Sequence, residues 1–201
     1  SKDQPRINQI SIFSDPMIPI MVQRNREVDS GNYQNPEVGQ KATFKSKIFF
    51  NKALSILEKY RDNTFGNFSL SFLFLSGDPN GRHSTKNSGE LLFIDIIALI
   101  LGGYFVYKRL KDRRYFFLLL LLFVGAIPAN LTMDGANHAS RLITFSGPLL
   151  LIVSLGYFSL SKSILFFTFA AIWMFAVLQF LNSYFVHFPV QNHREFGYGY
   201  K

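Results

Sequence analysis

The chain has 201 residues, a formal net charge of +8 and no cysteine. The lack of cysteine excludes a disulfide framework, a thiolate metal site and a cysteine nucleophile. The composition divides the chain into two unlike parts. Residues 1–90 are polar and rich in Asn, Ser, Lys and Asp, whereas residues 91–186 are rich in Phe, Leu and Ile.

Residues 1–90 predict an external segment of mixed structure. Within it, residues 5–22 show short β-like stretches broken by prolines, and residues 23–43 have the Asn, Gly and Ser content of a loop. Residues 44–61 place apolar side chains between lysines, which predicts an amphipathic helix on the membrane surface. Residues 65–75 are apolar but too short to span, so a strand, an interfacial helix and a re-entrant segment each fit.

Four long apolar runs follow. A helix rises 1.5 Å per residue, so ~20 apolar residues cross a hydrocarbon core of about 30 Å. The first two runs are slightly short, but their flanking aromatic and basic side chains reach the interface. The predicted fold class is therefore mostly α, a polytopic membrane bundle of four helices followed by an external tail at 187–201. The four runs are 91–107, 115–131, 142–160 and 164–186.

The tightest basic cluster, residues 108–114, lies between the first two runs and indicates the orientation of the chain. Short loops rich in Lys and Arg stay in the cytoplasm. This rule places residues 1–90, the joint 129–141 and the tail outside, and the joint 161–163 inside, in a multi-pass protein of the plasma membrane. Basic charge placed between membrane runs argues for topology and against a nucleic-acid partner.

Three residues within the runs predict local features. Pro128 and Pro148 each remove a helical hydrogen bond, which produces either a packing kink or a break that opens an external cavity. Asp95 lies about one turn inside the first run. Acids within membrane helices are rare and usually face protein or water.

Two polar clusters flank the external mouth of the predicted bundle. We expect Arg141, Arg82, His83 and His138 to contact a phosphate, because a guanidinium binds phosphate at two points and imidazole can donate or accept a proton. The competing interpretations are that Arg141 extends to lipid head groups and that Asp78 only forms a turn. The clusters are Asp78, Arg82, His83, Lys86 and Glu90, and Asn130, Asp134, Asn137, His138 and Arg141.

Other sequence motifs give little evidence of a metal, cofactor or glycan site. Zinc-ligand spacing, a phosphate-binding glycine loop and a dinucleotide fingerprint are absent from the sequence, so we predict no metal and no certain cofactor. Asn67-Phe-Ser and Asn130-Leu-Thr match the glycan acceptor pattern, but such triplets often arise by chance.

Taken together, the chain resembles the C-terminal part of a GT-C type membrane glycosyltransferase, and is similar to bacterial relatives of protein mannosyltransferases and aminoarabinose transferases. The likeness covers most of the chain and depends on the order of its motifs. These are PRINQISIFSDP (5–16), FFNKAL (49–54), SLSFLFLSGDPNGRHS (69–84) with GEL (89–91), AIPANLT and NHASRLI within 126–143, FLNSYFVHFP (180–189) and FGYGYK (196–201).

The resemblance implies an activity. Such enzymes move a sugar from a polyprenyl-phosphate carrier to a glycan, lipid or protein acceptor at the external membrane face. A carboxylate acts as the base, and cationic side chains hold the lipid phosphate. In the family the catalytic acid lies in the first external loop, which this sequence does not match. We therefore expect a fragment that lacks the catalytic acid, and assign neither Asp78 nor Asp134 as the base.

The alternative is a non-enzymatic membrane subunit, part of a transporter or an assembly component. A transporter would be expected to carry ionisable residues deep in its spans. Here the middles of the apolar runs are nearly free of charge, and polar residues gather at one face. That distribution favours an enzyme acting at the interface.

Overall fold

The computed structural model describes residues 6–31, 43–161 and 166–192, and these residues are mostly helical. Within those ranges the structure contains no strand, and its β pairing is an isolated bridge between Ser11 and Thr132. The predicted mostly helical fold is thus confirmed, but the described part of residues 1–90 is helical rather than mixed.

The β-like interpretation of residues 5–22 is wrong. The chain forms a short helix α1 (Arg6–Ile10), a 3-10 turn η1 (Ile12–Ser14) and a helix α2 (Met17–Asp29). Pro16 caps α2 and Pro19 lies in its first turn, where backbone N–H groups have no partner within the helix. The prolines therefore start a helix instead of separating strands.

Several predictions fall partly outside the described residues. Of the predicted loop 23–43, residues 23–29 belong to α2, and residues 32–42 lie outside the described part of the chain. Pro5, most of the joint 161–163, and the tail beyond Asn192 also lie outside it.

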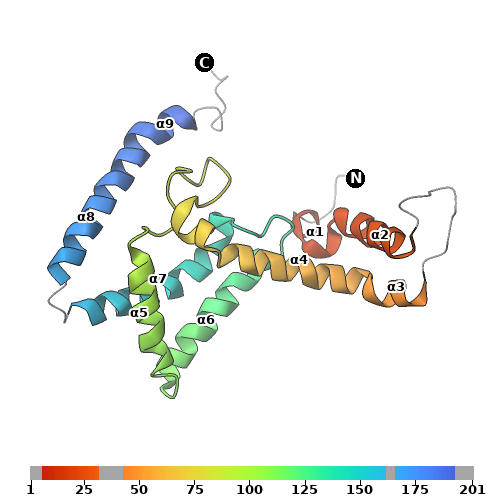
Figure 1. Cartoon of the computed structure of the whole chain (residues 1–201), viewed down its shortest axis with the longest axis horizontal. Helices are drawn as coiled ribbons and strands as arrows, with labels where there is room; N and C mark the ends of the chain where they lie inside the picture. The colour runs from red at the N-terminus through yellow and green to blue at the C-terminus, as the bar shows by residue number, and fades with distance from the viewer. Residues whose placement is uncertain (1–5, 32–42, 162–165, 193–201) are drawn as a thin grey trace.

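The helix predicted over 44–61 is confirmed, in two pieces. They are α3 (Phe44–Phe49) and α4 (Lys52–Asn67). The break follows from capping, because the Asn51 side chain accepts a hydrogen bond from the Leu54 N–H at 3.0 Å and starts a new helix. With α2 beside them, α3 and α4 form an arm that extends away from the other helices (Figure 1).

The apolar segment 65–75 is helical, so the strand alternative is wrong. After α4 the chain makes a π-helical turn, η2 (Ser71–Leu75), whose residues Phe72 to Phe74 are buried. The chain then returns along η2, and the Leu91 N–H donates to the Leu73 carbonyl at 2.8 Å. The loop 76–90, between η2 and Leu91, carries the first polar cluster. This loop therefore starts and ends beside η2.

Three helical segments are long and apolar enough to cross a membrane. The first is α6 (Arg113–Asn130). The second joins η3 (Ala139–Leu142) to α7 (Ile143–Leu160), and the third joins α8 (Phe166–Asn182), η4 (Ser183–His187) and α9 (Phe188–Gln191). Both α6 and α7 continue through their prolines. The remaining run forms α5 (Asp95–Tyr107), whose 13 residues cover only about 20 Å, so a fourth span stays a prediction.

The start of α5 is set by Asp95. Its Oδ2 accepts a hydrogen bond from the Leu92 N–H at 3.0 Å, so this carboxylate holds the turn before α5 and lies at the first residue of the helix rather than one turn inside it. Tyr157 of α7 donates its hydroxyl hydrogen to Oδ1 of the same side chain. Asp95 is buried, and its contact with Tyr157 links α5 to α7.

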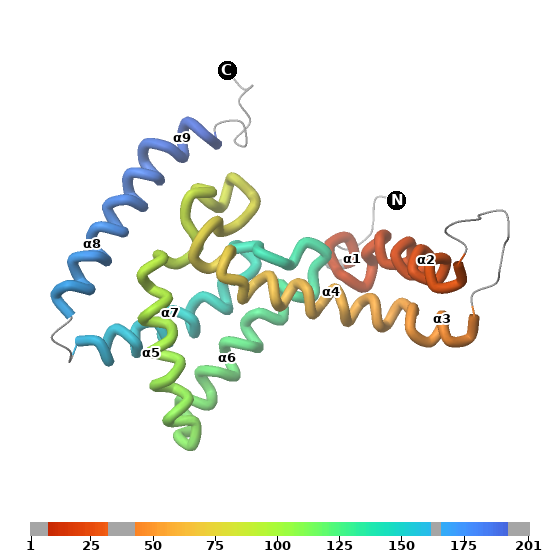
Figure 2. The backbone as a smooth tube through the Cα atoms, viewed as in Figure 1, coloured from red at the N-terminus to blue at the C-terminus, as the bar shows by residue number. Residues whose placement is uncertain are grey.

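Two glycines let α5 and α7 pack with their backbones in contact. A Cβ on Gly102 would overlap the carbonyl oxygen of Ile152, and a Cβ on Gly156 would overlap that of Ala98. Small residues at such positions allow the close helix pairs found in membranes. Figure 2 shows α7 crossing α5 and α6, which together carry the main hydrophobic core.

Gly102→Ala should destabilise the protein by about 1–3 kcal/mol, since the added methyl must push two backbones apart. The neighbouring Gly103 is the matched control, because a Cβ there meets nothing within 4 Å. Gly103→Ala should be neutral, or stabilising by up to about 1 kcal/mol. Thermal unfolding in detergent measures both. Equal melting temperatures for the two variants would contradict this account of the α5–α7 contact.

Candidate functional site

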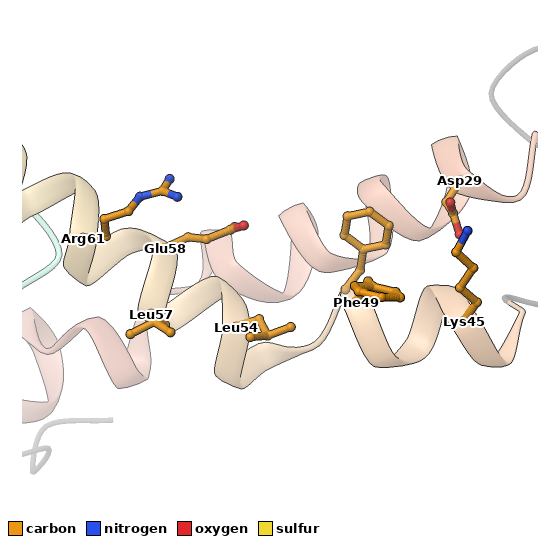
Figure 3. Close-up of a pocket in the computed structure, with 8 residues that line it drawn as sticks. Asp29, Lys45, Phe49, Leu54, Leu57, Glu58 and Arg61 are labelled. Carbon is orange, nitrogen blue, oxygen red and sulfur yellow. The ribbon is translucent and has the colours of Figure 1, made fainter.

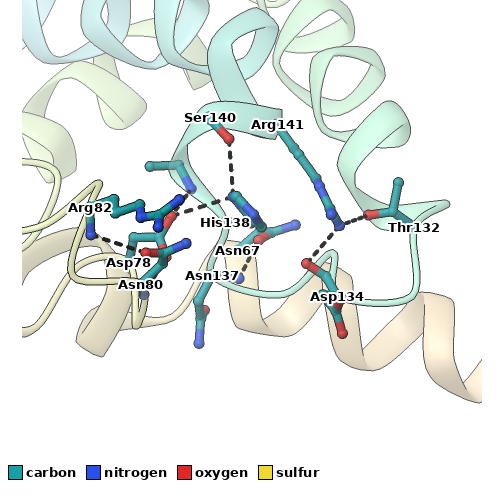
Figure 4. A network of polar contacts seen from close by, with 11 residues as sticks. Asn67, Asp78, Asn80, Arg82, Thr132, Asp134, Asn137, His138, Ser140 and Arg141 are labelled. Atoms are coloured by element: carbon teal, nitrogen blue, oxygen red, sulfur yellow. Dashed lines mark hydrogen bonds and ion pairs between the residues drawn. The ribbon is translucent and has the colours of Figure 1, made fainter. Parts of the chain in front are cut away.

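The structure brings the two predicted polar clusters together. Oδ2 of Asp78 accepts a hydrogen bond from the Ala139 N–H at 2.9 Å, and Nδ1 of His138 lies 3.4 Å from the same oxygen. The rings of His83 and His138 are 5.6 Å apart, centroid to centroid. Segments about 60 residues apart in sequence thus form one site (Figure 4).

Asp78 is the anchor of this site. Its Oδ1 accepts from the Asn80 N–H at 2.8 Å, and the Asn80 side chain accepts in turn from the Arg82 N–H at 3.0 Å. These are successive Asx turns, which wind the loop tightly. The Asp78 side chain is buried with both oxygens engaged. The turn interpretation of Asp78 therefore agrees with the structure, and a role as exposed base does not.

Arg141 holds the loop that follows α6. Its Nη1 donates to Oγ1 of Thr132 at 2.7 Å and to the Asp134 carbonyl at 3.0 Å (Figure 4). The side chain is therefore bound to protein, which differs from an arginine reaching to head groups. Both of these hydrogen bonds use the same guanidinium nitrogen.

The other cations lie at the edge of the 76–90 loop. Arg82, His83 and Lys86 are exposed, and Lys86 has a positive φ of 60°. Arg82 and His83 line a cavity between this loop and the last helix. The four predicted phosphate contacts therefore divide into two pairs, with Arg141 and His138 on one loop and Arg82 and His83 on the other.

Burial holds the pKa of His138 below its usual range. The charge of Asp78 opposes this shift, those of Arg141 and His83 reinforce it, and Asp134 has a smaller raising effect. The imidazole is therefore neutral near pH 7, where it can donate one hydrogen bond and accept another. Such a group binds an anionic ligand by hydrogen bonding without adding a full charge.

Glu90 lies at the opposite edge of the loop. Partial desolvation raises the pKa of its carboxyl, the Asp78 N–H opposes the shift by donating to it, and the Asp78 charge adds to it. The side chain is exposed, but neighbouring residues exclude part of the water around its carboxyl group. Glu90 is therefore an acid that accepts protons more readily than an isolated glutamate.

A buried asparagine network supports the site, and the sequence interpretation missed it. Nδ2 of Asn67 donates to Oδ1 of Asn130 at 2.8 Å, and Nδ2 of Asn63 donates to the Asn130 carbonyl at 3.0 Å. The Asn137 N–H donates to Oδ1 of Asn67 at 2.8 Å, and Asn130 donates to Thr64. Asn63, Asn67 and Asn130 are each at most 2% exposed.

This network gives the two glycan triplets a structural explanation. Asn67 and Asn130 bond to each other in the interior, so neither amide is open to modification in the folded protein. The available signal was the spacing of Asn63 and Asn67, which places two amides on one face of a helix.

A further cavity, of about 540 Å³, lies on the arm formed by α2, α3 and α4 (Figure 3). Its walls are mainly apolar, with four charged residues at the edges. None of the predicted phosphate contacts lines it. The lining residues are Asp29, Lys45, Phe49, Phe50, Leu54, Leu57, Glu58 and Arg61.

Comparison of the chain with family models, curated proteins and solved structures finds no match. In the parts of the chain that the structure describes, no three His, Asp or Glu side chains group closely enough to hold a metal ion. The family resemblance and the absence of a metal therefore stay predictions.

The lowered pKa of His138 predicts a pH effect on stability. Its value in the unfolded chain is about 6.5 and its folded value is lower, so below pH ~6.5 the unfolded state binds more protons. Stability is then lost as pH falls from 6.5 through the folded pKa. The variant His138→Gln should not show this loss. The melting temperature of the wild type should therefore fall more steeply than that of His138→Gln between pH 7.5 and 5. If the melting temperatures of the two proteins change with pH in parallel, His138 is not the source of the pH effect.

Proposed function

We propose that the protein is an integral membrane glycosyltransferase of the GT-C type, acting on a polyprenyl-phosphate-linked sugar at the external membrane face. One observation carries the proposal. Two loops distant in sequence meet where Asp78 accepts a hydrogen bond from the Ala139 N–H, and this brings the rings of His83 and His138 together. Arg82 and Arg141 lie close to these histidines in sequence. This site and the basic turn 108–114 lie at opposite ends of α5 and α6 (Figure 1).

The chemistry of the site fits a lipid phosphate. When the sugar leaves its carrier, the phosphate gains negative charge, and pre-positioned cations stabilise that charge in the transition state. Arg141 is held by two hydrogen bonds to its own loop, so its guanidinium needs little reordering when the ligand binds. Neutral His138 supplies a further hydrogen bond.

Apolar surface for the carrier and the bilayer lies next to the site. The last helical segment, from α8 to α9, has an apolar window with no buried residues. Large side chains such as Phe167 and Phe175 are 80% and 59% exposed on α8. Exposed rings of this size belong in hydrocarbon. In this proposal α5 also spans, with Tyr104 and Tyr107 extending it to the interface.

The arm lies in the interface in this proposal. Its exposed apolar residues Phe44, Ile48 and Phe49 accompany lysines on α3, the pattern of a helix that binds a membrane surface. The catalytic base stays unassigned, because both oxygens of Asp78 are engaged. In this proposal the base is a carboxylate of the first external loop that is typical of the family, and not Asp78.

The orientation predicts opposite labelling of the two ends. This chain contains no cysteine, so single cysteines introduced at exposed positions can be labelled cleanly. A membrane-impermeant maleimide applied to intact cells should label Ser140→Cys, and Lys111→Cys only after permeabilisation. The unsubstituted protein is the background control. Labelling of Lys111→Cys from outside, with Ser140→Cys shielded, would invert the topology and remove the basis for an external site.

Arg141→Ala should raise the KM for the lipid donor by roughly 10- to 100-fold, since a charge-assisted hydrogen bond is worth about 1.5–3 kcal/mol. The measurement is sugar transfer by the full-length protein in nanodiscs. Thr132→Val is the control, because it removes a partner of Arg141 within the loop but keeps the guanidinium.

Unchanged donor kinetics in Arg141→Ala would argue against phosphate binding there. A loss of the same size in Thr132→Val would assign Arg141 a purely structural role. Lack of any sugar transfer by the intact protein would favour the non-enzymatic subunit.

A further inference from the structure

The last apolar helix carries two unusual rows of side chains near its C-terminal end. One row is polar and the other is aromatic, and each recurs every four residues, so each follows one face of the helix. A helix surrounded only by lipid would not keep a polar row. The rows are Gln179, Ser183, His187 and Gln191, and Phe180, Tyr184 and Phe188.

Both rows face the loop that carries Arg82 and His83. The aromatic row lines a cavity of about 490 Å³ whose opposite wall belongs to that loop. The polar row lines a second cavity of about 500 Å³, which shares Ser88 and Phe180 with the first. Nδ2 of Asn87 is 3.2 Å from Oε1 of Gln191, which ties the loop to α9 (Figure 1 shows the two side by side).

The aromatic side chains stack on one another along the helix. The rings of Tyr184 and Phe188 are 5.5 Å apart and inclined by 9°, and those of Phe180 and Tyr184 are 6.1 Å apart and inclined by 25°. Rings stacked in this way present a continuous apolar strip along the helix. A pyranose has one face of C–H groups that fits such a surface through dispersion and weak C–H contacts.

The opposite wall supplies hydrogen-bonding groups. Oγ1 of Thr85 and Oγ of Ser88 lie 2.9 Å apart, and the carboxylate of Glu90 completes this edge. The wall is rigid, because Gly89 lies against the backbone of Leu73 and Phe74. Hydroxyl and carboxylate groups facing an aromatic wall match the hydroxyl rim and the apolar face of a sugar ring.

We propose that the cavity between the 82–90 loop and the α8–η4–α9 face binds a pyranose saccharide, with its ring against Tyr184 and its hydroxyls toward Thr85, Ser88 and Glu90. The inference deepens the proposed function and rests on it. His83 lines this cavity and its ring lies 5.6 Å from that of His138, so the saccharide and phosphate subsites adjoin.

The size and polarity of the space favour a saccharide over a hydrocarbon chain. A volume of about 490 Å³ lies in the range of small-molecule pockets, and the neighbouring cavity extends it. A prenyl chain would place the charged carboxylate of Glu90 and the hydroxyl pair of Thr85 and Ser88 against hydrocarbon, which is unfavourable.

Two sources of the sugar ring are compatible with this chemistry, the donor and the acceptor. The test compares binding of short-chain polyprenyl phosphates, bare or carrying mannose or glucose, to the full-length protein in nanodiscs. Tyr184→Ala should weaken binding of the sugar-bearing lipid by roughly 5- to 10-fold and leave the bare lipid phosphate unchanged. Tyr184→Phe should keep most of the affinity.

Phe175→Ala is the matched control, since this ring lies on α8, is 59% exposed and lines neither cavity. It should change neither affinity. If the saccharide comes from the acceptor, Tyr184→Ala instead raises the acceptor KM with donor affinity unchanged. Equal loss for bare and sugar-bearing lipids would identify a prenyl-chain groove and overturn the inference, as would no change in either donor affinity or acceptor KM.

Failure of the proposed function gives a different result, namely a wild-type protein that binds neither lipid phosphate. Saturation-transfer NMR with methyl mannoside and methyl glucoside then decides the inference alone. Transfer to the ring protons that is lost in Tyr184→Ala and kept in Phe175→Ala would support a saccharide site. Absence of transfer to the wild type would overturn it.

Discussion

The hydrogen bond between Asn67 and Asn130 is the contact on which the site depends. It joins α4, part of the arm formed with α2 and α3, to the end of α6, and both amides are almost fully buried. Loss of either amide would leave its partner unsatisfied, at a cost of about 1–3 kcal/mol in a protein whose total stability is ~5–15 kcal/mol. The Asn137 N–H joins the same network, so the network also fixes the loop that carries His138 and Arg141.

That loop in turn positions the other half of the site. Asp78 accepts from the Ala139 backbone, so the 76–90 loop is held by the position of the 131–141 loop. The Asx turns at Asp78 and Asn80 then direct the chain past Arg82 and His83. Beneath this polar end, the close α5–α7 contact at Gly102 fixes the helices. The two loops that carry the site are thus held in place by hydrogen bonds to backbone groups and asparagine amides.

Periodicity and hydropathy predicted the long apolar helices and the helix over 44–61, because these elements bury or expose one continuous face. They failed over 5–22, where Pro16 and Pro19 lie at the start of a helix. In a sequence, prolines at the start of a helix look the same as prolines that end a strand.

The asparagine network was missed because Asn67 and Asn130 match a surface pattern, and only tertiary contact shows their burial. The polar row that includes Ser183 was hidden by the apolar average of its run. The meeting of the two polar clusters depends on loop geometry, which no local pattern encodes.

The distribution of ionisable groups bears on the choice between enzyme and transporter. Asp95 is the acid within the four apolar runs, and the structure holds it between the Leu92 N–H and the Tyr157 hydroxyl, where it links α5 to α7. An ion-coupled transporter needs an acid that can exchange its partners during the cycle. A fixed acid inside the helices, with the histidines and arginines of the two loops lying at the end opposite the basic turn 108–114, instead suits a reaction performed where the membrane meets water. In the reaction that we propose, the helices would hold a lipid, and the polar end would bind the phosphate and the sugar.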